Sequence, residues 1–376
     1  MKVLFWSETF WPRVGGVENL AAKLLSALRE RDHDFAVVTW ESTALPDKIF
    51  YEDIPVYRFP FFASSNHSAI EQVMKCRRQI ADLKDCFAPD LVHINSYGQS
   101  VLFHLNTSNA HPAPALVTLH QPLPEQPIQN DSLLGHLLRS SEWINTCSNA
   151  VLAHAQRLMP EIIPYSSVIY NALTAPKFDP QPLSCDPPRL LCVGRLVPEK
   201  AFDKALTAFT SVLERFPHAR LIIAGDGPER ENLTKQMNDL GLGNSVEFLG
   251  SISPEMVFHQ MNKATLVVIP SRIEGFGLVA LEAALMARPV VAMRVGGLSE
   301  VVVHEETGLL VEQDAVGGIT KAILFLLGRP QTANMFGAAA RRRAQEVFKF
   351  ERYVDAYDDL YHRLARKPPP LHAVSL

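Results

Sequence analysis

The stretch 265-TLVVIPSRIEGFGLVALEAALMARPVVAM-293 decides the fold, because it holds two β-branched runs separated by one helical pattern. The runs 265–271 and 289–293 are typical of buried strands, and a helix is expected to open near Gly277. A strand, a helix and another strand in succession predict a unit of a parallel sheet covered by helices. The stretch also holds two carboxylates, Glu274 in the loop and Glu282 in the second turn of the expected helix.

The same alternation continues in both directions along the chain. Upstream, strands are expected at 2–6, 34–40, 55–59, 90–94, 115–120, 144–148 and 166–170, and the clearest helix at 16–31. Around the opening stretch, further strands are expected at 189–194, 219–225, 245–250 and 308–312, followed by a helix-rich tail from about 314 to 366. Between the two series lies 173–188, which has five prolines in sixteen residues and no periodicity.

These patterns predict an α/β protein of two doubly wound, Rossmann-like domains. The expected boundaries are 1–172 for the first domain, 173–188 for a linker and 189–347 for the second domain, with a helix at 348–366 packing back on the first. Ligands of such sheets bind at the carboxyl ends of the strands, so two domains that face each other would enclose a central cleft.

Composition excludes several classes of protein. The chain has 376 residues, 47% hydrophobic and 20% charged, with a net charge of −4, so it lacks the basic field that holds nucleic acid. Five cysteines, an odd number, favour reduced thiols in the cytoplasm over a disulfide framework. The first apolar run, Val3–Trp6, is too short for a signal peptide, and no later run is long enough to span a membrane.

Two glycines and two cations follow expected strands at positions that suit phosphate. Gly15 and Gly16 stand where the helix 16–31 begins, and Arg195 and Lys200 follow the strand 189–194. Backbone N–H groups at a helix start and paired cations both favour a diphosphate. A plain tight turn and solvated surface cations are the alternatives. The chain contains neither a dinucleotide-binding G-x-G-x-x-G after a strand nor a P-loop.

The two carboxylates suit the hydroxyl groups of a ligand. Because Glu274 precedes the helix and Glu282 lies within it, the loop can wrap a ligand and present one acid to each part of it. The N–H groups of Phe276, Gly277 and Leu278 would point at phosphate or sugar oxygens. A capping acid followed by a helical surface acid is an equally good interpretation of the spacing.

Five segments of the second half resemble one enzyme family. They are LLCVGRLVPEKAFDKAL, LIIAGDGPEREN, VEFLGSISPEMV, PSRIEGFGLVALEAALMARPVVA and VGGLSEVVVHEETGLLV, within residues 188–312. Their order and spacing resemble those of the retaining glycosyltransferases of family 4, which have the two-domain GT-B fold. The start of the chain, TFWPRVGGVENLAAKLLSALRERDHDFAVVT, also looks like this family, and the middle of the first domain matches it loosely.

The resemblance implies a role for each matching residue. Arg195 and Lys200 would hold the diphosphate of a nucleotide sugar, Glu274 would contact the transferred sugar and Glu282 would bind the ribose. The main chain of Phe276, Gly277 and Leu278 would lie near the sugar and phosphates, and Gly15 and Gly16 would approach the phosphates. His120 matches a histidine placed beside the reacting sugar; the alternative is a strand-end histidine with a backbone partner.

Three departures from the family pattern concern its glycines and its acceptor side. Ala201 follows Lys200 where the family usually has glycine. Asn171 is kept, but the common glycine and aspartate after it are missing. A proline-rich segment, 120–130, replaces the short loop after the histidine. The last two departures affect the identity of the acceptor more than the chemistry of the donor.

The predicted function is therefore retaining transfer of a sugar from a nucleoside-diphosphate sugar to a glycan, lipid-linked or small-molecule acceptor. Another GT-B activity, such as a sugar-nucleotide epimerase or a phosphorylase, and a non-catalytic sugar-nucleotide-binding protein remain the alternatives. The sequence shows no convincing nucleophile, and no cofactor or metal is expected. The one Asp-x-Asp, Asp32–Asp34, is interpreted as a solvated turn.

Location follows from the same features. A cytoplasmic protein is expected, with no nucleic-acid partner. The segment 74–86 carries Lys75, Arg77, Arg78 and Lys84 and could form a basic amphipathic helix at the inner face of the membrane. A solvated helix face is the alternative.

Overall fold

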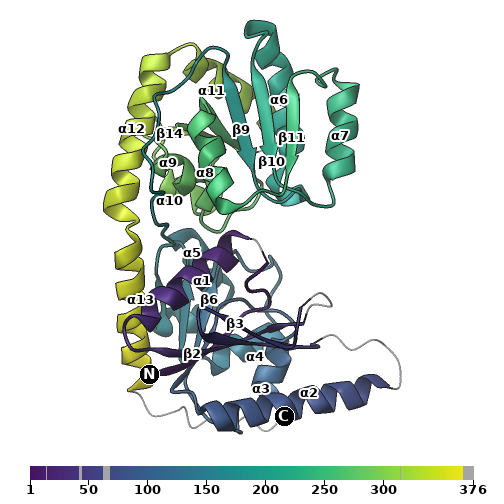
Figure 1. The fold of residues 1–376 in the computed structure, drawn as a ribbon, viewed down its shortest axis with the longest axis vertical. Coiled ribbons are helices and arrows are strands. Elements are labelled where there is room, and N and C mark those ends of the chain that lie inside the picture. Colours follow the sequence, from purple (N-terminus) through teal and green to yellow (C-terminus); the bar gives the residue numbers. More distant parts are fainter. Residues whose placement is uncertain (14, 42–44, 62–67, 314, 367–376) are drawn as a thin grey trace. The chain divides into compact units, whose positions relative to one another are not determined.

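The computed structural model describes residues 1–13, 15–41, 45–61, 68–313 and 315–366. The chain divides into two compact units (Figure 1). The first unit holds the chain up to Tyr170 together with the residues from Glu351 onward, and the second unit is Asn171–Phe350. The chain therefore passes between the units twice.

The first unit is built on an eight-stranded sheet with the order β3-β4-β2-β1-β5-β6-β7-β8. Its strands are β1 (Lys2–Trp6), β2 (Asp34–Trp40), β3 (Lys48–Tyr51), β4 (Ile54–Phe59), β5 (Leu91–Ile94), β6 (Ala115–Leu119), β7 (Trp143–Thr146) and β8 (Ser166–Val168). All neighbours pair in parallel except β3 and β4. Strand β1 lies between β2 and β5, so the strand order reverses there.

The antiparallel edge strand β3 is the element that the sequence patterns missed. It joins β4 through Glu52 and Asp53, whose φ angles are 45° and 65°. Two central residues with positive φ are typical of the type I′ turn of a tight hairpin. Such turns are usually signalled by Asn-Gly or Asp-Gly, so a Glu-Asp turn leaves no clear trace in the sequence.

The helices of the first unit are α1 (Gly16–Arg29), α2 (Ser68–Phe87), α3 (Val101–Asn106), α4 (Leu133–Ser140), α5 (Asn149–Leu158) and α13 (Phe350–Ala365), with a 3₁₀ helix at Pro160–Tyr165. Helix α1 buries Leu20, Leu24 and Leu28, which follow one another at a spacing of four, against the sheet. Within the described part of the chain, no helix is both long and apolar enough to cross a membrane.

The second unit is built on a six-stranded parallel sheet with the order β11-β10-β9-β12-β13-β14. Its strands are β9 (Arg189–Val193), β10 (Arg220–Ala224), β11 (Val246–Gly250), β12 (Leu266–Ile269), β13 (Val290–Met293) and β14 (Gly308–Val311). Its helices are α6 (Phe202–Arg215), α7 (Arg230–Asp239), α8 (Pro254–Lys263), α9 (Leu278–Leu285), α10 (Leu298–Val301), α11 (Val316–Leu327) and α12 (Pro330–Val347), with a 3₁₀ turn at Pro198–Lys200.

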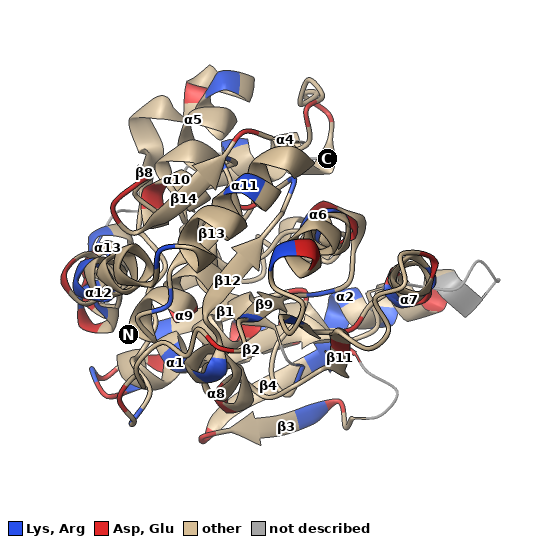
Figure 2. Cartoon of the chain, turned by 90° about the horizontal axis from the view of Figure 1, so that it is seen from above, with Lys and Arg blue, Asp and Glu red and all other residues tan. Residues whose placement is uncertain are grey.

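Strands β12 and β13 of the second sheet are buried and uncharged. Every residue of β12 and β13 is buried, as expected for strands covered on both faces. In Figure 2 these strands carry no charged residues, and the charged residues of the sheet itself, Arg189, Arg220 and Glu247, lie on β9, β10 and β11. The functional groups of this unit must therefore come from the loops that follow the strands.

Helix α13 docks on the first unit through buried polar groups. The Tyr361 hydroxyl lies 2.6 Å from Nδ1 of His93, whose Nε2 lies 2.8 Å from the Thr118 hydroxyl. The Asn145 amide donates to the Tyr357 hydroxyl over 3.0 Å. These side chains join β5, β6 and β7 to the helix in one hydrogen-bonded network, so the last described helix completes the core of the first unit.

The proline-rich segment 173–188 lies against the second unit. The ring of Phe178 stacks on His259 with 4.7 Å between the centroids, and Asp179 pairs with Arg341 over 3.0 Å. The buried guanidinium of Arg288 donates to the carbonyl of Gln181. A segment without regular structure is thus held by specific contacts.

The structure corrects one member of the basic face predicted on α2. Lys75, Arg77 and Arg78 are exposed, but Lys84 is buried and donates to the carbonyl of His104 over 3.0 Å. Lys84 was counted on the basic face because it lies in a charged stretch, whereas its side chain follows Cys76 and Ile80 at a spacing of four onto the buried face. Burial lowers the pKa of Lys84 to about 7.

Candidate functional site

The loops after β9 and β12 lie at the same edge of the second sheet. The two strands are parallel neighbours, with Leu190 opposite Leu266. Strand β9 ends at Val193 and is followed by Gly194 and Arg195, and β12 ends at Ile269 and is followed by the loop to α9. Parallel strands point their carboxyl ends the same way, so these loops are brought together where α/β sheets bind ligands.

An ion pair joins the two loops directly. The ammonium group of Lys200 donates to Oε1 of Glu274, and the Ser271 hydroxyl donates to the same oxygen over 2.9 Å. The Lys200 side chain is 22% exposed and that of Glu274 is 10% exposed. Two predicted site residues are therefore in contact. Lys200 was predicted to bind the diphosphate and Glu274 the sugar, but here they bind each other.

A glycine turn after β13 fixes the backbone of Glu274. Gly296 has φ of +48°, and a Cβ atom there would collide with the carbonyl oxygen of Glu274. The N–H of Gly297 donates to that carbonyl over 3.3 Å. Only glycine permits both this φ angle and this approach, so the VGG turn at 295–297 sets the position of the acid.

Helix α9 begins directly after the loop. Gly277 precedes it with φ of +104° and ψ of 55°, and Leu278 is its first residue. The ring of Phe276 is buried edge-on against Phe348, which anchors this end of the loop. The first N–H groups of a helix have no partner within the helix and carry partial positive charge, so the residues from Phe276 to Leu278 suit an anion or a hydroxyl.

The other two predicted residues of this unit, Arg195 and Glu282, are exposed to different degrees. Glu282 lies in the second turn of α9 and is partly exposed. Arg195 is exposed, and no described residue pairs with its guanidinium group. An arginine held at a strand end without a partner can meet a phosphate without first breaking an ion pair.

The backbone conformation of Ala201 shows why the family usually has glycine at this position. Ala201 ends the 3₁₀ turn with φ of 51° and ψ of 41°, in the left-handed region, and is buried. That region costs a residue with Cβ about 1–2 kcal/mol, and glycine avoids the cost. The turn therefore keeps its shape here with alanine, at the expense of strain.

In the first unit, Gly15 and Gly16 stand at the start of α1. Gly15 precedes the helix in an extended conformation, and Gly16 is its first residue and is exposed. The carboxylate of Glu18 lies beside Gly15 and accepts a hydrogen bond of 2.7 Å from Thr9. The helix start thus already holds a negative charge, which a phosphate at the same place would have to displace.

His120 follows β6 at the carboxyl edge of the first sheet, as predicted for a strand-end residue. Its Nε2 lies 3.0 Å from the side-chain oxygen of Asn95, which follows the neighbouring strand β5. Burial lowers the pKa of His120 to about 4, so the ring is neutral at physiological pH. Within the described chain, His120 Nδ1 and Asn95 Nδ2 are buried without hydrogen-bond partners.

Asn95 is a site residue that the sequence reasoning missed. A signal was present, because this polar residue comes directly after the expected strand 90–94. An unpaired buried amide and an unpaired buried imidazole nitrogen on adjacent strand ends are costly unless a ligand or water satisfies them. The pair belongs to the first unit, and the ion pair of Lys200 and Glu274 belongs to the second.

Two family models match adjoining stretches of the chain. The model described as "Glycosyltransferase Family 4" matches residues 14–174, and the one described as "Glycosyl transferases group 1" matches residues 175–343. Together they cover residues 14–343, which include Asn95, His120, Lys200 and Glu274.

Relatives with similar sequences carry transferase or synthase names. Glycogen synthase of Mycobacterium tuberculosis is 30% identical over 239 residues, which are 62% of this chain and 58% of that protein. A GDP-mannose-dependent phosphatidylinositol monomannoside mannosyltransferase of Mycolicibacterium smegmatis is 36% identical over 44% of this chain and 45% of its own. The chain thus spans about half the length of these relatives. An uncharacterized glycosyltransferase of Methanocaldococcus jannaschii is 26% identical over 97% of this chain and 99% of its own.

Solved structures share the fold over the whole chain. A sucrose-phosphate synthase from Thermosynechococcus elongatus has a TM-score of 0.82 at 23% identity, over 96% of this chain and 98% of that one. The Anabaena protein HepE, solved with UDP and glucose, has a TM-score of 0.80 at 21% identity, over 97% of this chain and all of that one. At this identity the likeness concerns the fold.

Proposed function

Because this chain belongs to the group 1 glycosyltransferases with a family 4 first domain, we propose that it transfers a sugar from a nucleoside-diphosphate sugar to an acceptor, with retention of configuration. The contact between Lys200 and Glu274 at the carboxyl edge of β9 and β12 is the observation that carries the proposal. In this contact a cation that could bind a diphosphate and a carboxylate that could bind a sugar are joined by one hydrogen bond, which supports the proposal.

The charges of the second unit support a donor site. Arg195 and Lys200 would hold the diphosphate and stabilise the negative charge that develops on it as the sugar leaves. Glu274, fixed by Ser271 and by the Gly296 turn, would accept hydrogen bonds from sugar hydroxyls. Glu282, in the second turn of α9, would bind the ribose hydroxyls, and the start of α9 would lie near the phosphates.

The first unit supplies the groups for the reacting sugar and the acceptor. The neutral ring of His120 can exchange a hydrogen bond with a hydroxyl through Nδ1, and its partner Asn95 can donate from Nδ2. We assign no enzymic nucleophile. Attack by the acceptor on the face from which the diphosphate leaves accounts for retention without one.

A metal ion is unnecessary for this chemistry in our proposal. Two cationic side chains at the diphosphate can do the work that a divalent ion does in other transferases. The expected result is that a chelator such as EDTA leaves nucleotide binding and transfer unchanged. A requirement for added Mg²⁺ or Mn²⁺ would overturn this part.

The acceptor is proposed only by class. It is a glycan, a lipid-linked or a small-molecule acceptor. The exposed Lys75, Arg77 and Arg78 on α2, next to the 55% exposed Met74, would suit contact with an anionic membrane surface. We propose a cytoplasmic protein that contacts the inner face of the membrane when its acceptor is a lipid.

The test is a thermal-shift and calorimetric comparison of UDP, GDP, ADP, dTDP and CMP. We expect one nucleoside diphosphate to raise the melting temperature by mass action, and Arg195→Ala and Glu282→Ala to remove that rise. Arg215→Ala and Glu214→Ala are matched controls, because both residues are exposed in the last turn of α6 at the opposite edge of the sheet.

Turnover then separates the alternatives. Transfer of the sugar from the matching donor to an acceptor supports the proposal. Conversion of the donor without an acceptor would point to an epimerase, and binding without any turnover to a non-catalytic protein. Failure of all five nucleotides to bind would overturn the donor site itself.

A further inference from the structure

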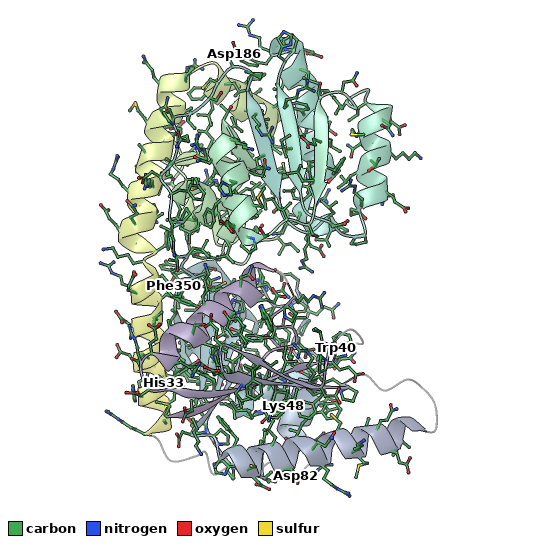
Figure 3. All side chains as sticks on the ribbon, viewed as in Figure 1. His33, Trp40, Lys48, Asp82, Asp186 and Phe350 are labelled. Carbon is green, nitrogen blue, oxygen red and sulfur yellow. The ribbon has the colours of Figure 1, made fainter. Side chains whose placement is uncertain are left out.

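The turn between α1 and β2 buries a histidine that the sequence interpretation left in solvent. Asp32 and Asp34 of this turn are exposed, as expected, but the side chain of His33 between them is fully buried. It points at helix α13, beside which it lies in Figure 3. His33 comes before β2, so this place is at the amino edge of the first sheet, away from the residues of the candidate site.

Two imidazole nitrogens converge there on one carboxylate oxygen. Nε2 of His33 lies 2.8 Å from Oδ1 of Asp358, and Nε2 of His362 lies 3.3 Å from the same oxygen. Asp358 and His362 are four residues apart on α13, so they share one face of the helix. The three ligand atoms all lie within 4.8 Å of one another.

We propose that His33, Asp358 and His362 form a binding site for a divalent transition-metal ion such as Zn²⁺. Tetrahedral zinc with bonds of about 2.0–2.1 Å requires its ligand atoms to be about 3.3 Å apart. The two imidazole nitrogens lie 2.8 and 3.3 Å from Asp358 Oδ1, close to that separation, and within 4.8 Å of each other. Two imidazoles and one carboxylate are ligands that zinc prefers, whereas calcium and magnesium prefer oxygen alone.

The surroundings of the three side chains favour this role. Arg31 binds the other oxygen of Asp358 over 3.1 Å, which leaves Oδ1 to the imidazoles and orients the carboxylate as a ligand. The side chains of His362 and Asp358 are 52% and 20% exposed, so an ion and a completing water molecule can reach the site.

The surroundings of His33 also determine the affinity of the site for Zn²⁺. Coordination through Nε2 leaves the ring proton of His33 on Nδ1, a buried atom with no hydrogen-bond partner among the described residues. A hydrogen-bonded partner at this position typically improves metal affinity by about 10- to 100-fold. We therefore expect micromolar binding of Zn²⁺, weaker than that of four-ligand structural zinc sites.

A bound ion would fasten helix α13 to the start of β2. His33 and Asp358 are separated by 325 positions in the chain, so the ion would tie together two segments that are far apart in sequence. Metal binding to the folded state alone stabilises that state by mass action. The predicted effect is therefore on the stability of the first unit, with no step of the reaction involved.

The test uses the full chain without a histidine tag, after treatment with a chelator. We expect calorimetry to show one Zn²⁺ bound per chain and Co²⁺ to give the visible absorption of a four-coordinate site. His362→Ala should weaken Zn²⁺ binding at least tenfold and remove the Co²⁺ absorption, because it deletes a half-exposed ligand without disturbing the core. Asp358→Asn should weaken binding as well.

His304→Ala is the matched control. His304 lies 3.9 Å from a carboxylate oxygen of Glu305 in an exposed pair, and no third metal-ligating group joins them among the described residues. It should leave Zn²⁺ binding unchanged. Absence of one-to-one binding by the wild type, or equal binding by His362→Ala and His304→Ala, would overturn the proposal. Thermal unfolding without metal verifies that each variant is folded.

Discussion

Lys200 and Glu274 pair with each other across two neighbouring strand ends although they are 74 positions apart in the chain. Each charge neutralises the other, and both side chains are mostly buried. A diphosphate that takes Lys200 as a partner must compete with the carboxylate of Glu274. If the donor binds as we propose, it exchanges one ion pair for another, and the two residues should respond differently to substitution.

Glu274→Gln should separate binding from turnover. Removing the carboxylate releases Lys200, so we expect the nucleoside diphosphate to bind as tightly as to the wild type or more tightly. Lys200→Met removes a charged hydrogen bond and should weaken that binding by roughly 10- to 100-fold. Both variants should lose most of the transfer activity. Calorimetry with the nucleotide measures binding, and equal loss of affinity in both variants would contradict the exchange.

Gly296→Ala should disturb Glu274 through the backbone. Its Cβ would meet the carbonyl oxygen of Glu274, and the φ of +48° adds a cost of about 1–2 kcal/mol. We expect a lower melting temperature and weaker nucleotide binding.

Gly317→Ala is the comparison for that variant. Gly317 lies in α11 with no atom near the position of a Cβ, and alanine there should stabilise the protein by about 0.5–1 kcal/mol. Chemical denaturation of both variants measures the difference. A Gly296→Ala protein as stable as the wild type would show that the turn does not constrain the acid.

Ala201→Gly should lower the free energy of unfolding less than Ala205→Gly, one turn into α6. At Ala201 the loss of a buried methyl group, about 0.8 kcal/mol, is offset by release of the left-handed strain. At Ala205, buried in α6, glycine loses the methyl group and about 1 kcal/mol of helix propensity. We expect Ala205→Gly to be less stable than Ala201→Gly by about 2 kcal/mol in denaturant titrations. The reverse order would show that Ala201 is unstrained.

Lys84→Met should stabilise the protein at neutral pH. Burial lowers the pKa of Lys84 to about 7, against 10.5 for the free side chain, so the unfolded chain binds this proton more tightly. The resulting penalty is complete below pH 7 and disappears as the pH rises toward 10.5. His104 O keeps other donors, Thr107 N and Oγ1, so methionine leaves it satisfied.

We expect a gain of about 2–4 kcal/mol at pH 7 that shrinks as the pH approaches 10. Denaturant unfolding of wild type and variant at a series of pH values measures it. Lys75→Met, on the exposed face of the same helix, should leave the stability unchanged at every pH. A gain that does not vary with pH would mean that Lys84 is charged in the folded protein.

The sequence predicted the parallel strands well, because the runs 265–271 and 289–293 each contain a fully hydrophobic strand, 266–269 and 290–293. It also placed Lys200 and Glu274 at strand ends. The contact between Lys200 and Glu274 could not be predicted, because spacing along the chain does not reveal which loops become neighbours. The hairpin at Glu52 and Asp53 was not predicted, because neither residue is typical of a tight turn. The inward direction of Lys84 was hidden because a charged stretch suggests a solvated surface.

The position of helix α13 late in the chain affects the order in which the two units fold during synthesis on the ribosome. Residues 1–170 emerge first, yet His93, Thr118 and Asn145 meet their hydroxyl partners only when Tyr357 and Tyr361 leave the exit tunnel. Until then the nascent first unit exposes the surface of β5 to β7 that the helix covers. The contiguous second unit, Asn171–Phe350, can complete its own sheet before that moment. Synthesis therefore finishes the first unit last, and a chain truncated before Tyr357 would be a substrate for chaperones and proteases.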